Sequence, residues 1–191
     1  PPTFDFHKLN WASVGKLPNF SLKEENEIKT KDIKLSNLPD FFGVDRALAC
    51  LAALKIIKNP LKKDLLIADF GTILSITKLR SNGTIIGGQL APGLLTQLKS
   101  MEVYTQNLTA PAKYKIPSKD FLINTEDAIL KGVSNSITGL INSSFNPLKD
   151  ILITCGGDSE LMTKILNHKD KDIIKEPNLV MKGMIIHHQS Q

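Results

Sequence analysis

The chain has 191 residues, 41% of them apolar, which is enough to bury a core as one domain or as two small ones. No apolar run approaches the roughly 20 residues that cross a bilayer, and the start lacks a signal-peptide pattern, so we expect no membrane partner. The net charge of +5 comes from scattered lysines with few aromatic residues, which argues against a nucleic-acid partner, and the distant Cys50 and Cys155 are typical of reduced thiols in a cytoplasmic protein.

Residues 1–37 are the least informative part of the chain. Trp11 to Gly15 has the pattern of the end of a buried strand, with a turn permitted at the glycine. The charged stretch 24–34 is compatible with a solvated loop or with an edge strand. We expect little regular structure here beyond that strand end.

A helix is predicted from Val44 to Lys58, because apolar residues recur at helical spacing and Asn59-Pro60 ends the pattern. Asp45 lies in its first turn, where the helix dipole favours a carboxylate. Periodicity alone gives this acid no role beyond that.

The most informative stretch, residues 65–93, predicts three consecutive strands and two tight turns. Ser81-Asn82-Gly83 predicts a hairpin with a type I′ turn, because Asn-Gly accepts positive φ at both central positions. Phe70-Gly71-Thr72 makes the other turn, directly after Asp69. Small turn residues beside an acid are how proteins bring phosphate and its metal close to backbone N–H groups. Strands are expected over residues 65–69, 73–79 and 84–90.

The second half begins with a helix predicted over 94–105, followed by a loop over 107–121. Asn124-Thr125-Glu126-Asp127 is a capping residue followed by two acids, which predicts a helix to about Asn142. Gly132 and Gly139 lie inside this helix and predict close packing against a neighbour.

The last part of the chain predicts a strand, a glycine pair and a helix. The strand is expected over 150–154 and the helix over 159–168, with Gly156-Gly157 between them. Glycines there let a nucleotide approach the backbone, although the same pattern also makes an ordinary tight turn. Residues 178–188 form an apolar segment of undetermined type, and His187-His188 is interpreted as tail, with a two-histidine metal site left open.

Together these stretches resemble the type III pantothenate kinases, members of the actin-like and sugar-kinase superfamily. The resemblance covers roughly residues 11–186, and the joint order and spacing of its motifs is more specific than any one of them. Trp11 to Pro18 is similar to the family's strand end before the linker. The other motifs, in family order, are Gly43-Val44-Asp45-Arg46, Asp69-Phe70-Gly71-Thr72, the run from Gly87 to Gly93, Asn124-Thr125 and the run from Thr154 to Asp158.

The resemblance implies an α/β fold with duplicated ribonuclease H-like domains. The family's Asp-x-Gly-Asn-Thr phosphate loop is not found, so we expect the first domain to be incomplete, through truncation or loss. Residues 1–60 are then a partial N-terminal domain and 61–191 the C-terminal one. Ser36 stands where the family often has a tyrosine that lines the pantothenate pocket.

The activity implied is ATP-dependent phosphorylation of pantothenate to 4′-phosphopantothenate, the first step of coenzyme A biosynthesis. ATP would come with magnesium, and the family also needs potassium or ammonium. The resemblance makes Asp45 the general base and gives Asp69 the monovalent cation, where the residue pattern alone leaves a turn-forming role equally open. It also implies a pantothenate site lined by Gly43, Val44 and Arg46, in which Arg46 binds a carboxylate or a phosphate. For ATP, it implies phosphate contacts from Gly71 and Thr72 and adenosine contacts from Gly156 and Gly157. Thr125, which also fits a helix cap, would reach pantothenate across a homodimer interface.

Two alternatives stay open at this level. One is a non-catalytic relative that binds a nucleotide or a protein partner. The weaker one is a nucleic-acid-binding regulator, which rests on the +5 charge alone. The kinase interpretation makes one geometric demand, namely that Asp45 and Asp69 converge on a single cleft.

Overall fold

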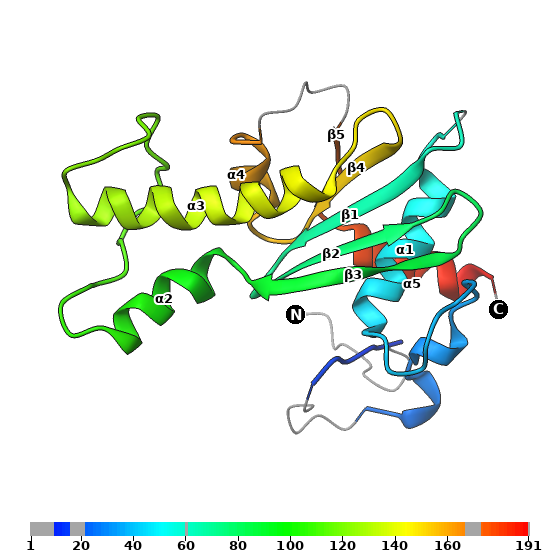
Figure 1. The fold of residues 1–191 in the computed structure, drawn as a ribbon. Coiled ribbons are helices and arrows are strands. Elements are labelled where there is room, and N and C mark those ends of the chain that lie inside the picture. Colours follow the sequence, from blue (N-terminus) through cyan, green and yellow to red (C-terminus); the bar gives the residue numbers. More distant parts are fainter. Residues whose placement is uncertain (1–9, 16–21, 60, 167–172, 191) are drawn as a thin grey trace, which may run out of the picture.

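A five-stranded sheet forms the centre of the computed structural model, which describes residues 10–15, 22–59, 61–166 and 173–190 (Figure 1). The strand order is β3-β2-β1-β4-β5. The first three strands are antiparallel neighbours, whereas β4 and β5 run parallel to β1. The predicted strands are confirmed to within two residues, and β5 is an addition. The strands are β1 (Asp64–Phe70), β2 (Ile73–Leu79), β3 (Ile85–Pro92), β4 (Asp150–Cys155) and β5 (Ile173–Lys175).

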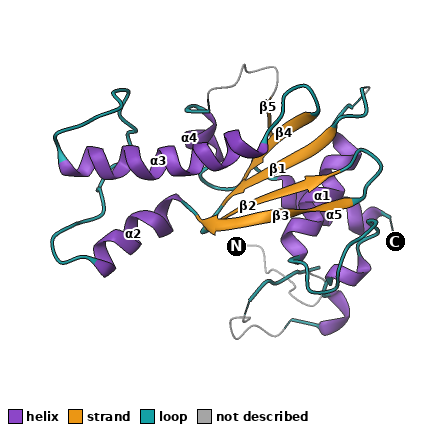
Figure 2. Ribbon diagram, in the orientation of Figure 1, coloured by secondary structure: helices purple, strands orange, loops and turns teal. Residues whose placement is uncertain are grey.

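Helices cover both faces of this sheet (Figure 2). One face packs against α1 (Val44–Ile56) and α5 (Leu179–Gln189). The other packs against α2 (Leu94–Tyr104), α3 (Thr125–Ser144) and α4 (Ser159–Thr163). Among the described residues, no helix is long and apolar enough to cross a membrane.

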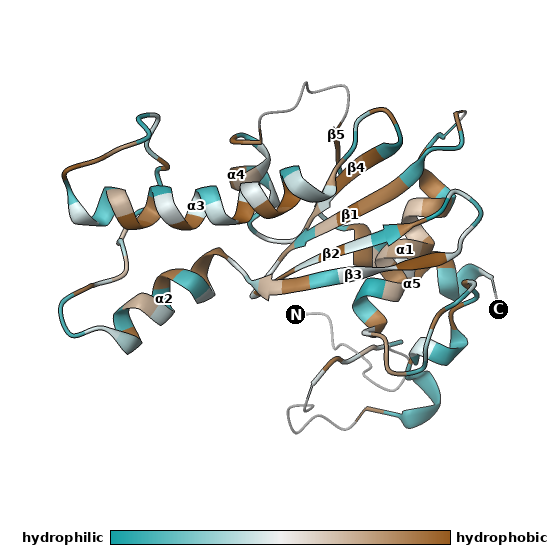
Figure 3. Ribbon diagram, in the orientation of Figure 1, coloured by the Kyte–Doolittle hydropathy of each residue, from teal (hydrophilic) through white to brown (hydrophobic). Residues whose placement is uncertain are grey.

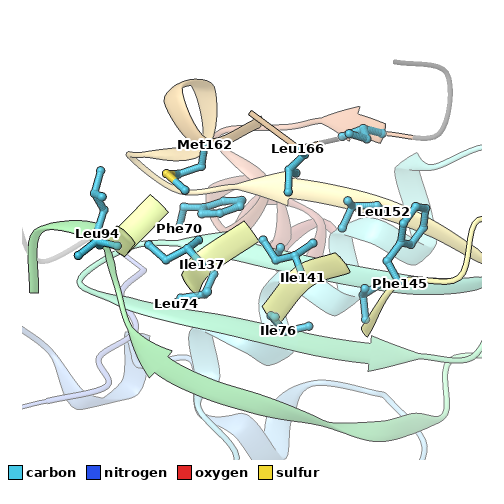
Figure 4. Close-up of a cluster of buried hydrophobic side chains, with 14 of the residues drawn as sticks. Phe70, Leu74, Ile76, Leu94, Ile137, Ile141, Phe145, Leu152, Met162 and Leu166 are labelled. Carbon is cyan, nitrogen blue, oxygen red and sulfur yellow. The ribbon is translucent and has the colours of Figure 1, made fainter. Parts of the chain in front are cut away.

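Strand alternation decides which side chain meets which helix. Along β1, Leu66 and Phe70 join the core under α3, where Figure 4 labels Phe70, and Leu65 and Ile67 join the core under α1. Hydrophobic residues therefore dominate β1 and β4, the strands with helices on both sides (Figure 3). The row that faces α1 ends at Asp69, the last residue of that face before the turn.

Both cysteines belong to the core under α1. Cys50 and Cys155 are free and buried, in agreement with the expectation of reduced thiols. Burial raises the pKa of Cys50 to about 12, and it raises the pKa of Cys155 as well. Both thiols therefore stay protonated at neutral pH, which makes them poor nucleophiles.

The turn type predicted for the β2–β3 hairpin is wrong. A type I′ turn needs positive φ at Asn82, but Gly83 alone in this turn has it, with φ 87°. The Gly83 N–H donates to the Arg80 carbonyl at 2.9 Å, and the strand register shifts between Lys78 and Leu79. The glycine after the turn thus takes the left-handed conformation, as in hairpins with a bulge.

The packing predicted for the glycines of α3 is also wrong. Gly132 and Gly139 are exposed, and a Cβ on either would meet nothing within 4 Å. The cap prediction for the same helix is confirmed, because Asn124 Oδ1 accepts a hydrogen bond from the Asp127 N–H at 3.0 Å. Thr125 is therefore the first helical residue and not the cap.

Three further segments differ from expectation. Trp11 makes only an isolated bridge to Glu27, not a strand, and residues 16–18 of that motif lie outside the described residues. The stretch 24–34 contains two short 3₁₀ helices, η2 (Glu24–Asn26) and η3 (Thr30–Asp32). Helix α4 ends at Thr163, and Asn167 and His168 lie outside the described residues. The segment of undetermined type is α5, and the interpretation of His187 as tail is wrong, because this helix buries it.

Candidate active site

A cavity of about 580 Å³ lies between the N-terminus of α1 and the turn that follows β1. Asp45 and Asp69 both line it, so the geometric demand of the kinase interpretation is met. The cavity brings together six of the residues singled out from the sequence, which are Gly43, Asp45, Arg46, Asp69, Gly71 and Thr72.

Asp45 lies over the start of α1. Gly43 is the N-cap residue and offers no side chain to the first turn. The Asp45 carboxylate fills this role, because its Oδ1 accepts a hydrogen bond from the Arg46 N–H at 2.7 Å. A Cβ at Gly43 would lie 2.7 Å from the same oxygen, so a side chain there would push the carboxylate out of this position. Unpaired N–H groups at a helix N-terminus stabilise a negative charge in this place.

Asp69 sits opposite Ser75 of β2 and Cys155 of β4 in the strand register. Burial raises the pKa of Asp69 above its ordinary value, and the negative charge of Asp45 raises it further. Within the described part of the chain, no donor makes a hydrogen bond to this carboxylate. A hard cation would offset this half-buried charge, and a carboxylate oxygen is the ligand type that such cations prefer. Asp69 therefore fits a cation site.

The turn after β1 is clamped by the motif that ends β3. The Thr72 carbonyl accepts hydrogen bonds from the Gly93 N–H at 2.8 Å and from Thr96 Oγ1 at 2.7 Å. A Cβ at Gly93 would collide with the Gly71 carbonyl oxygen, so only glycine allows this approach. The Thr72 side chain is left exposed beside the cavity. The turn is thus rigid while its hydroxyl remains available to a ligand.

The two glycines after β4 have different positions. Gly156 has φ 88° and packs against Asp69 Oδ1 and the Phe70 carbonyl. Gly157 is exposed and lines a second cavity of about 340 Å³, which Thr72 and Tyr114 also line. Gly156 therefore brings the loop against β1, and Gly157 faces space that a ligand can enter.

Arg46 crosses the face of the sheet from α1. Its Nε donates a hydrogen bond to Thr77 Oγ1 at 3.0 Å, and its guanidinium carbon lies 4.0 Å from the centroid of the Phe42 ring. Burial lowers the pKa of Arg46, although a guanidinium stays charged in proteins. It makes no ion pair with any described residue, so this cation is available to an anion in the cavity.

Sequence reasoning missed Thr77 and Phe42. A signal was present in β2, because Ser75 and Thr77 are polar residues on the face that elsewhere packs against α1. Two polar positions spaced by two in a buried strand indicate a polar patch on one face.

Besides the two glycines after β4, two predicted residues do not line the cavity. Thr125 is exposed at the start of α3, a helix of 20 residues that measures roughly 30 Å in length. Val44 is buried and lines a neighbouring cavity of about 670 Å³ together with Gly43 and Phe41. Within one chain, neither lines the cavity that holds Asp45 and Asp69.

The sequence model for the family described as type III pantothenate kinase matches residues 16–146. The chain belongs to the type III pantothenate kinase family. This match contains Asp45, Asp69 and the β3 motif, and it ends before β4. Most of the residues that line the cavity around Asp45 and Asp69 therefore lie in the part of the chain that the family model matches.

Individual type III pantothenate kinases are similar over most of this chain. The protein of Porphyromonas gingivalis is 27% identical over 149 residues, which cover 74% of this chain and 59% of the relative. That of Bacteroides fragilis is 29% identical over 185 residues, with shares of 94% and 73%. That of Synechococcus elongatus is 30% identical over 166 residues, with shares of 84% and 64%. The chain thus spans from 59% to 73% of the length of these three relatives.

Solved structures place this type III pantothenate kinase family member among actin-like folds. A Campylobacter jejuni protein described as a putative Baf family transcriptional activator aligns with TM-score 0.65 at 22% identity, over 87% of this chain and 74% of its own. The apo psk41 ParM protein aligns with TM-score 0.50 at 13% identity, over 75% of this chain and 46% of its own. At such identities the likeness concerns the fold alone, and it agrees with the fold class expected from the motifs.

Proposed function

We propose that this chain phosphorylates pantothenate with ATP, giving 4′-phosphopantothenate for coenzyme A synthesis in the cytoplasm. The observation that carries the proposal is the meeting of Asp45, Asp69 and Arg46 in one cavity beside a glycine turn. Phosphoryl transfer depends on positioning and charge neutralisation more than on covalent chemistry. Two carboxylates and one unpaired cation around a substrate-sized cavity supply both.

Asp45 is the proposed general base. Its carboxylate is held over the N-terminus of α1 by the Arg46 N–H and faces the cavity. A carboxylate is a weak base, but it serves in phosphoryl transfer because the alcohol loses its proton late, as the transferred group arrives. Fixing the carboxylate on a helix end keeps it within reach of one alcohol position.

Asp69 is the proposed ligand of potassium or ammonium. The half-buried charge described above, which accepts no hydrogen bond from a described residue, supports this role. The described residues include no group of three or more candidate metal ligands, so we propose that magnesium arrives with the ATP phosphates. These cations would supply positive charge near the transferred group.

For ATP, we propose that the phosphates lie at Gly71 and Thr72. The rigid turn and its exposed hydroxyl support this placement. The second cavity, with Gly157 on its wall, begins at the same turn and suits the adenosine. Gly156 contributes indirectly, by holding that loop against Asp69.

A homodimer is proposed to complete the pantothenate site with Thr125 of the second copy. Helices α2 and α3 project beyond the sheet in Figure 1, and Thr125 lies on this projection. Their free ends carry exposed apolar side chains, which a second copy would cover. These side chains are Val103, Tyr104, Phe121 and Ile123.

The division of the chain into two domains is a further proposal. Residues 61–191 contain the whole sheet, and residues 1–60 end in α1, which packs on that sheet from the cavity to the hairpin. We propose that 1–60 belong to a first ribonuclease H-like domain and 61–191 form the second.

The test is consumption of pantothenate by the purified chain with ATP, magnesium and potassium. We expect turnover that Asp45→Asn lowers by about 10²- to 10⁴-fold, the usual contribution of a general base. Asp64→Asn, at the opposite end of β1, is the matched control and should retain activity. Unchanged turnover in Asp45→Asn contradicts the base assignment. Binding of pantothenate without any turnover favours the non-catalytic alternative, which rests on the phosphate loop not found in this sequence.

A further inference from the structure

The Arg46 side chain is enclosed on three sides. Thr77, which is 2% exposed, accepts the Nε–H, and the Phe42 ring covers one face of the guanidinium. The third side is the bare backbone of Gly88, where a Cβ would collide with Nη2 of Arg46. We call Phe42, Thr77 and Gly88 the Arg46 cradle.

The cradle depends on strand register. Thr77 and Gly88 are direct partners in the β2–β3 ladder, so a hydroxyl and a bare glycine lie side by side on the sheet. An arginine needs such a gap to lie flat across two strands, and a ring on its other face adds a cation–π contact. With Nε occupied, the Nη groups are left for a planar, two-oxygen partner.

The cradle also lies away from the phosphate turn. Thr77 is five residues along β2 from Thr72, a span of roughly 16 Å at strand rise. Asp69 is level with Ser75, between the two. Pantothenate carries its reacting hydroxyl and its carboxylate at opposite ends. A hydroxyl at the carboxylates and phosphate turn therefore puts the substrate carboxylate toward Arg46.

From this geometry we infer that Thr77, Phe42 and Gly88 are positioning residues that fix Arg46 as the receptor for the carboxylate of the substrate. The inference rests on the proposed function, and it assigns Arg46 to the carboxylate of the substrate and not to a phosphate. A fixed guanidinium gives up less rotational freedom when it binds, so its bond to the carboxylate is stronger. Such a contact, equal in ground and transition states, acts on affinity and not on turnover.

The test compares Thr77→Val, which removes the acceptor at constant shape, with Thr77→Ser, which retains it. Each is titrated by calorimetry with pantothenate and with pantothenol, whose neutral alcohol replaces the carboxylate. We expect Thr77→Val to bind pantothenate about tenfold more weakly, the scale of one hydrogen bond to a charged group. Thr77→Ser should stay close to the unsubstituted chain, and pantothenol affinity should be the same in all three.

Two further measurements separate positioning from simple damage. Thr138→Val removes another buried hydroxyl, bonded to the Ser134 carbonyl in α3, and should leave pantothenate affinity unchanged. By NMR, the Arg46 Nε–H should exchange slowly with water in the unsubstituted chain and in Thr77→Ser, and quickly in Thr77→Val.

Equal weakening for pantothenate and pantothenol overturns the inference, as does a Thr77→Val variant with full pantothenate affinity. A chain that binds pantothenate through the cradle but shows no turnover contradicts the proposed function and leaves the inference standing. A chain that binds no pantothenate overturns both.

Discussion

The substitution Gly183→Ala tests the contact that holds α1 in place. Gly183 is buried in the middle of α5, and a Cβ there would lie 2.6 Å from the Leu48 carbonyl carbon and 3.0 Å from its Cα. These are backbone atoms of α1, so no side-chain rotation relieves the collision. The two helices must separate, and α1 carries Asp45 and Arg46 at its start.

The expected magnitude combines two opposing effects. Alanine is the better helix former by about 1 kcal/mol. Overpacking against rigid surroundings costs about 1–3 kcal/mol, and the upper end applies because the obstacle is backbone. The net loss in the free energy of unfolding is therefore about 2 kcal/mol. For a chain of this size, that corresponds to a fall in Tm of about 4–8 °C.

The matched control is Gly139→Ala, the same chemical change in an exposed helix position with nothing within 4 Å. It should raise the free energy of unfolding by about 1 kcal/mol, since only helix propensity acts. Urea unfolding followed by circular dichroism measures both variants. A Gly183→Ala variant as stable as Gly139→Ala refutes the reasoning, because the α1–α5 approach would then be loose.

Two further predictions concern buried charges. Burial and the charge of Asp45 raise the pKa of Asp69, so the ionised Asp69 opposes folding above that pKa and this effect disappears below the ordinary aspartate value. Asp69→Asn should therefore raise Tm at pH 7 but not near pH 3, and should remove any rise in Tm that potassium gives; a lower Tm at pH 7 contradicts this. Lys78 Nζ lies 2.8 Å from Oδ1 of the fully buried Asp150. Lys78→Met should lower the free energy of unfolding by about 3 kcal/mol in urea titrations, the lower end of the cost of breaking a buried ion pair because Lys78 is partly exposed; unchanged stability would show that the pair is dispensable.

Strands β1 to β4 and helix α1 were predictable, because α1 has apolar residues at helical spacing and the strands are short apolar or β-branched runs bounded by turn residues. The same reasoning failed for α5, whose apolar stripe is masked by exposed Met181 and Ile185. Strand β5 has only three residues, too few for a pattern to register. For a helix, local sequence therefore predicts the element when its exposed face is polar, and it loses the element when the exposed face is apolar too.

Sequence patterns also gave wrong predictions where tertiary contacts determine the local conformation. Asn-Gly allows two turn types in a hairpin, and the register shift beside Leu79 selects the one with a bulge. Glycine inside a helix is compatible with close packing or with none, and α3 and α5 provide one case of each. Only the neighbouring element distinguishes these outcomes.

The two acids of the site were predictable, and the residues that position Arg46 were not. Local patterns mark the positions of Asp45 and Asp69, at the start of a helix and at the end of a strand, and the family resemblance singled them out as site residues. Thr77 and Gly88 meet through the β2–β3 register, and a shift by one residue would point both to the other face of the sheet. That register is a property of the assembled sheet.

The location of the site follows from how α1 covers the sheet. Its alanine-rich turns pack over Leu65 and Ile67, and Leu54 near its end lies 3.2 Å from where a Cβ of Gly83 would be, in the hairpin. The helix thus runs from the cavity toward the hairpin, and its first turn begins where the apolar row of β1 gives way to Asp69. One end of this face is buried as core, while the other meets a helix N-terminus and two carboxylates. Polar chemistry gathers there because that is where the helix stops shielding the sheet from water.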